Sequence, residues 1–126
     1  MPRDVRAYLA DVVDACDAIT AAVHDVGFRR DQSSRLIRSS VEREFITIGE
    51  ALAALGRAAA EVFDRIAQAR RIVDFRNQLT HQYRTVDDAI VWAIAERDVP
   101  VLHRECADYL RRLGSLTDAG SKGDDD

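Results

Sequence analysis

The chain has 126 residues, of which 47% are hydrophobic and 32% are charged, and its formal net charge is -4 at pH 7. This composition is typical of one globular domain and excludes a collagen-like or mainly disordered chain. No apolar run reaches the roughly 18 residues that a membrane span requires. Because Asp4 and Asp11 interrupt the segment where a signal peptide would be apolar, we expect a cytoplasmic protein.

The charge is unevenly distributed along the chain. Residues 117–126 contain four Asp and one Lys, so the preceding residues are close to neutral. Seventeen of the eighteen basic residues are Arg, and the planar guanidinium group suits carboxylate or phosphate ligands. The acidic balance argues against broad electrostatic binding to nucleic acid, and it is compatible with a local phosphate site.

The first three predicted elements are amphipathic helices. The first covers residues 5–26, where apolar residues recur every three or four positions before Gly27. A second helix with the same spacing is predicted over about residues 33–59, and a third over about residues 65–82.

The fourth predicted helix begins after Thr85, which can cap its first turn together with Asp88. Pro100 lies inside this helix, and proline lacks the amide hydrogen that the turn needs. We therefore predict a kink or a break near residues 97–100. Four helices with short connections, and no alternating strand pattern, predict an all-α antiparallel four-helix bundle.

The end of the fourth helix defines the expected domain boundary. Gly114 is a residue that commonly terminates helices, and it is followed by a segment rich in Gly, Ser and Asp. We therefore predict one helical domain over residues 1–114 and a disordered acidic tail over residues 115–126.

Several reactive residue types are better explained by structural roles. Cys16 and Cys106 occupy core positions without CxxC spacing, which predicts buried free thiols. His24 and His103 lie on helices without a second ligand at metal-binding spacing. The acidic residues lack the Glu-x-x-His pattern of a di-iron bundle, so neither a metal nor another cofactor is expected. Those acidic residues are Glu42, Glu44 and Glu50, whereas Asp11, Asp14 and Asp17 are expected to form a solvated helix face.

Residues 76–83 read RNQLTHQY and form the strongest candidate site. Since each residue of a helix advances by about 100°, the polar side chains fall in one continuous stripe beside the apolar face. The stripe consists of Arg76, Asn77, Thr80, His81 and Tyr83. A guanidinium, an amide, an imidazole and a phenol at the edge of the core favour a functional site over a solvated face of interchangeable charges.

These residues carry a resemblance to a known family. Arg76, His81 and Tyr83 match the R-x4-H-x-Y motif of the HEPN superfamily, and the chain resembles the HepT-type toxins of toxin–antitoxin pairs. The similarity covers about residues 3–113. It includes DVRAYLADVVDACDAI near the start, VEREFITIGEAL with its Gly-Glu-Ala triplet, and FRNQLTHQY followed by IVWAI.

The resemblance implies a metal-independent endoribonuclease that acts as a homodimer, with both motifs facing one cleft. The 2′-hydroxyl of the RNA, a tRNA or an mRNA, would be the nucleophile. His81 would exchange protons near neutral pH, and Arg76 would hold the scissile phosphate. Asn77, one turn before His81, would orient the imidazole or bind phosphate.

The resemblance also implies a partner, a minimal nucleotidyltransferase that serves as antitoxin in a type VII-like pair. In part of the family this partner transfers AMP onto the motif tyrosine, here Tyr83. An adenylyl group would place bulk and negative charge beside Arg76 and so repel RNA. The alternative is that Tyr83 only packs at the core edge.

Two other functions remain open on the sequence. The stronger is a catalytically silent HEPN adaptor that binds a nucleotidyltransferase partner or a nucleotide, since a fold does not determine an activity. The other is a helical bundle without a site. The pairing of Arg76 with His81 favours the nuclease, because an adaptor has no need for both.

Overall fold

The structure is a computed structural model that describes residues 4–26, 35–81 and 87–125. Within those residues all regular elements are helices, and four of them pack as a bundle, which confirms the predicted fold class. The elements are α1 (Val5–Val26), α2 (Arg35–Ala58), α3 (Ala60–Arg65), α4 (Ala69–His81) and α5 (Asp88–Asp125).

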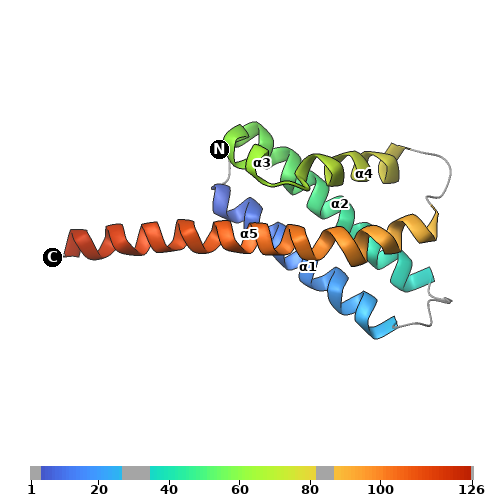
Figure 1. The fold of residues 1–126 in the computed structure, drawn as a ribbon. Coiled ribbons are helices and arrows are strands. Elements are labelled where there is room, and N and C mark those ends of the chain that lie inside the picture. The colour runs from blue at the N-terminus through green and yellow to red at the C-terminus, as the bar shows by residue number, and fades with distance from the viewer. Residues whose placement is uncertain (1–3, 27–34, 82–86, 126) are drawn as a thin grey trace.

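The helix α2 holds the bundle together. It packs against α1, α3 and α4, while α1 also packs against α5 (Figure 1). Apolar residues every three or four positions give α1 and α2 the continuous buried stripes that this packing needs. Among helices of the described residues, none combines the length and apolar character that crossing a bilayer demands.

The core is built from the predicted apolar stripes. The largest fully buried side chains are Phe45, Leu9, Ile19, Ile48, Leu52, Leu55, Ile72, Leu102, Val12, Val41, Val91 and Val99. Cys16 and Cys106 are buried and free, as predicted. Loss of hydration on burial raises the pKa of the Cys106 thiol to about 12 and also raises the pKa of the Cys16 thiol.

Aspartates cap two of the helices. The Arg6 backbone amide donates to Asp4 Oδ1 over 2.8 Å at the start of α1. At the start of α5, the Ala89 amide donates to Asp87 Oδ1 over 2.9 Å. Both carboxylates satisfy an amide that has no partner within its own helix. The predicted cap, Thr85, lies outside the described residues.

The single helix predicted over residues 65–82 is wrong in its first part. The chain forms the short α3, turns at residues 66–68 and begins α4 at Ala69. In the turn, the Ile66 amide donates to the Phe63 carbonyl and the Ala69 amide donates to the Ile66 carbonyl, each over 3.1 Å. Ile66 and Ala69 are buried, so apolar contact with the core holds a turn that local spacing does not reveal.

The last helix is longer than the sequence predicted. α5 runs as one helix through Pro100, and it continues past Gly114 to Asp125. Pro100 is exposed, so water can bond to the carbonyl that loses its partner at the proline. Figure 1 shows α5 extending beyond the other helices at its C-terminal end. The division between a domain of residues 1–114 and a disordered tail of residues 115–126 stays a prediction.

Candidate functional site

The helix α4, which carries most of the polar stripe, is anchored to α2 by aromatic packing. Phe75 and Phe45 meet edge to face, with ring centroids 5.1 Å apart and ring planes at 89°. Ile72 is fully buried one turn earlier. Edge-to-face contact adds a directional attraction to the burial of both rings, so it fixes the rotation of α4 about its axis.

Two polar contacts join α4 and the turn before it to α5. The Ala67 backbone amide donates to Glu105 Oε1 over 3.1 Å. Arg71 Nε lies 3.0 Å from Oδ2 of Asp98, whose side chain is only 12% exposed. The separation is that of an ion pair, but the geometry is not that of a hydrogen bond. Sequence reasoning missed this pair, because Arg71 and Asp98 are far apart in the chain and each resembles an ordinary surface charge.

Arg76 lies over a glycine of α2. A Cβ atom added to Gly49 would lie 2.3 Å from Arg76 Cβ and 2.5 Å from Arg76 Cγ. The two helices therefore approach at a point where only hydrogen fits on α2. Arg76 is half-buried, and its Nε is shielded from solvent with no hydrogen-bond acceptor among the described residues. A shielded donor without an acceptor is unfavourable for stability, so its presence calls for an explanation.

The other described members of the stripe are exposed. Asn77 and His81 face solvent, and His81 is the last residue of α4. The Thr80 hydroxyl donates to the Arg76 carbonyl over 3.1 Å, so it is engaged within its own helix. Tyr83 lies outside the described residues.

Arg76 and His81 do not point to the same place within one chain. Five residues along a helix correspond to a rotation of about 140° and a rise of about 7.5 Å. Arg76 faces α2, whereas His81 points in nearly the same direction as Asp74, seven residues earlier. A single chain therefore presents its cation and its imidazole on different sides of α4.

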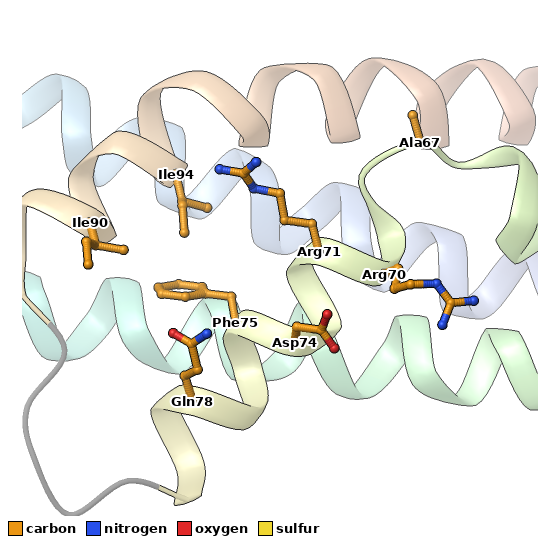
Figure 2. A pocket seen from close by; sticks show the side chains of 8 residues that line it. All are labelled: Ala67, Arg70, Arg71, Asp74, Phe75, Gln78, Ile90 and Ile94. Atoms are coloured by element: carbon orange, nitrogen blue, oxygen red, sulfur yellow. The ribbon is translucent and has the colours of Figure 1, made fainter.

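A groove of about 640 Å³ lies on the side of α4 away from Arg76, between α4 and the first turns of α5. Figure 2 shows the Phe75 ring on one wall and the side chains of Ile90 and Ile94 on the other. Polar groups rim the groove at Arg70, Arg71, Asp74 and Gln78, and Ala67 lies at its far end.

Among the described residues, the remaining histidine, cysteine and acidic side chains do not form a second site. His103 Nε2 lies 2.9 Å from Asp17 Oδ1, which ties α5 to α1. Within the part of the chain that the structure describes, no group of three His, Cys, Asp or Glu side chains is placed to hold a metal ion.

The family of the chain is shown by comparison with known proteins. The model of the family described as "Ribonuclease HepT-like" matches residues 12–109. That range includes Gly49, Arg76, Asn77 and His81, the residues that give the site its shape. The fold is an all-helical bundle with a polar stripe on α4, and the chain belongs to the HepT-like ribonuclease family. The resemblance seen in the sequence is confirmed.

Individual relatives have names of the same class. The chain is 29% identical to "Putative RNase MJ1380" of Methanocaldococcus jannaschii over 82% of this chain and 94% of the relative. It is 27% identical to "Putative RNase MJ0125" of the same organism, over 88% and 95%. A bacterial relative, "Putative RNase TTE0752" of Caldanaerobacter subterraneus, is 22% identical over 85% and 95%. No solved structure matches the chain.

Proposed function

We propose that the protein is a cytoplasmic, metal-independent endoribonuclease and the toxin of a type VII-like toxin–antitoxin pair. Membership of a ribonuclease family and the names of the relatives support the RNase activity. The observation that carries the proposal is the placement of Arg76, whose stem packs against Gly49. Its Nε is shielded from solvent and has no acceptor among the described residues. The helix that carries it ends at the exposed His81.

The proposed reaction needs only groups of the RNA and of this chain. The 2′-hydroxyl attacks the neighbouring phosphorus, and the bond from phosphorus to the 5′-oxygen breaks, which yields a 2′,3′-cyclic phosphate and a 5′-hydroxyl. One imidazole accepts the proton of the 2′-hydroxyl, and an imidazolium donates a proton to the departing 5′-oxygen. The Arg76 guanidinium holds the phosphate and stabilises the negative charge that grows on its oxygens.

A homodimer would complete this site. One imidazole cannot serve as base and as acid at the same moment, and Arg76 and His81 of one chain point about 140° apart on α4. Two copies related by a two-fold axis would bring two of each group to a shared cleft. Asn77 lies within about 40° of His81 on the helix, where it can orient the imidazole or contact phosphate.

Cleavage of labelled RNA by purified protein in the presence of EDTA tests this proposal. We expect the wild type to cut, and we expect Arg76→Ala and His81→Ala each to lower the rate by about 10²–10³-fold. Arg57→Ala, which removes an exposed Arg of α2, is the matched control and should cut at the wild-type rate. Equal cutting by His81→Ala, or cutting that requires a divalent metal, would contradict the proposal.

The adaptor function makes a different prediction in the same assays. A catalytically silent adaptor would bind a nucleotidyltransferase partner or a nucleotide, and it would cut no RNA. Expression in a bacterial host should arrest growth if the protein is a nuclease, and Arg76→Ala should remove the arrest. Arrest that persists in Arg76→Ala would separate the toxicity from RNA cleavage.

The antitoxin is proposed to be a minimal nucleotidyltransferase that binds the toxin and transfers AMP to Tyr83. The added phosphate would repel RNA from Arg76. Intact mass after incubation with the partner, ATP and magnesium should increase by one AMP. Tyr83→Phe should abolish the gain, whereas the control Tyr109→Phe should keep it. A gain that survives Tyr83→Phe would exclude this residue as the target.

A further inference from the structure

Gly49 differs from the other glycine of α2 in what surrounds it. An added Cβ at Gly56 would lie 3.2 Å from the Phe63 ring, a contact that a small adjustment relieves. At Gly49 the same atom would lie 2.3 Å from Arg76 Cβ, a separation that unbonded carbons do not adopt. Gly49 is therefore required by the position of Arg76, whereas Gly56 is not required in this way.

The contact at Gly49 is rigid because of the atom that would be struck. The Cβ of Arg76 is bonded directly to the backbone of α4, so it cannot swing aside as the end of a long side chain can. A methyl group at residue 49 would either push α4 away from α2 or force the Arg76 stem into another rotamer. Both movements would displace the guanidinium group.

The position of Gly49 within α2 supports a specific role. It lies in the middle of a 24-residue helix, where glycine is less favourable than alanine. Its backbone also approaches Arg76 Nε, which would lie 3.3 Å from the added Cβ. The slot thus confines the Arg76 stem from Cβ to Nε.

We infer that Gly49 is a positioning residue, which fixes the Arg76 guanidinium for the phosphate by leaving a slot for the stem of that side chain. This inference rests on the proposed ribonuclease function, in which Arg76 contacts the scissile phosphate. A long flexible side chain loses much rotamer freedom when it is fixed, and a prepared slot removes that loss from the reaction step. Gly49 itself touches neither the RNA nor the reacting atoms.

A kinetic double-mutant cycle tests the inference. We expect Gly49→Ala to slow single-turnover cleavage at saturating RNA by about 10–100-fold, because small displacements of a positioned group have large effects on rate. In an Arg76→Gly background, which removes both the positioned group and the Cβ that the added methyl would strike, Gly49→Ala should change the rate by less than about twofold. An equal loss in both backgrounds, or wild-type cleavage by Gly49→Ala, would overturn the inference.

A stability cycle tests the contact without any need for activity. Gly49→Ala should lower the melting temperature by roughly 5–15 °C through overpacking. Arg76→Gly removes the carbons that the added methyl would strike. The double variant should therefore melt at nearly the same temperature as Arg76→Gly alone. This comparison holds even if Gly49→Ala alone does not fold. Gly56→Ala is the matched control and should change the melting temperature by the same amount in both backgrounds. A loss from Gly49→Ala that is the same in both backgrounds overturns the inference.

The NMR signal of the Arg76 Nε–H group gives a third readout, specific to position. The signal can be assigned by its disappearance in Arg76→Ala. In the wild type it should exchange slowly with solvent, and in Gly49→Ala it should shift and exchange faster. An unchanged signal in folded Gly49→Ala would overturn the inference. If Arg76→Ala cut RNA at the wild-type rate, the proposed role of Arg76 would fail instead, and these measurements would still decide whether Gly49 positions its side chain.

Discussion

The contacts of α1 with α5 and of α2 with α4 are built differently. The helices α1 and α5 pack together and contribute fully buried apolar side chains, among them Val12, Ile19 and Leu102. The helices α2 and α4 share the aromatic pair Phe45 and Phe75, but one turn of their contact consists of the Arg76 stem on a glycine. The first contact is what stability alone would favour, whereas the second keeps a cation and a shielded N–H at the edge of the core.

Under the proposed function, the α2–α4 contact gives up stability in order to hold Arg76. A buried donor without an acceptor lowers stability, and a glycine within a helix lowers it further. Proteins keep such costs mainly at functional sites. Stability and cleavage rate should therefore respond separately to changes in the two contacts.

The largest expected effect on stability comes from the α1–α5 contact. Leu102→Ala removes a fully buried side chain and leaves a cavity, so the free energy of unfolding should fall by about 2–5 kcal/mol. Urea denaturation measures this loss. The cleavage rate per folded molecule should stay at the wild-type value below the melting transition. A rate loss as large as that of Arg76→Ala would show that the two contacts are not independent.

Arg76→Met should act in the opposite direction at the α2–α4 contact. Methionine keeps an unbranched stem over Gly49 and removes the shielded N–H, so the free energy of unfolding should rise by about 1 kcal/mol. Cleavage should fall as far as in Arg76→Ala. Denaturation and cleavage of the same preparation measure both effects. A fall of more than about 1 kcal/mol in stability would mean that the polar atoms of Arg76 stabilise the fold.

The ion pair between α4 and α5 should contribute less. The Arg71 side chain is 66% exposed, so solvent screens its attraction to Asp98. A double-mutant cycle with Arg71→Gln and Asp98→Asn should give a coupling energy below about 1 kcal/mol. Both variants should cut RNA within twofold of the wild type. A coupling energy above about 1 kcal/mol, together with slower cutting, would show that contact with α5, rather than with α2, positions α4.

The buried thiols are expected to have the smallest effect on the free energy of unfolding at neutral pH. Burial raises the pKa of Cys106 to about 12 from an unperturbed 9.0, so the folded thiol stays neutral while the unfolded thiol ionises. The unfolded state then binds fewer protons, and the free energy of unfolding should fall as pH rises above about 9. Below that pH the thiol contributes no pH dependence. Denaturation at pH 7 and pH 10 measures the fall, and Cys106→Ala should reduce it; an equal fall in that variant would assign it to other groups.

Much of the fold could be predicted from local spacing. The stripes of α1 and α2 are long and regular, so their extent was predicted to within two residues. The turn between α3 and α4 could not be predicted, because α3 has only six residues and Ile66 is held by contacts distant in sequence. Ile90 is apolar but 48% exposed, since only packing decides which side of a helix is covered.

The sequence by itself determined the helical class, the buried thiols and the family motif, because each depends on residue type and on short-range spacing. Only the tertiary structure revealed that Arg76 rests on Gly49 and that Asp98 lies beside Arg71. Those contacts join residues 27 positions apart on different helices, and the distance between two helices is set by the packing of all their side chains together.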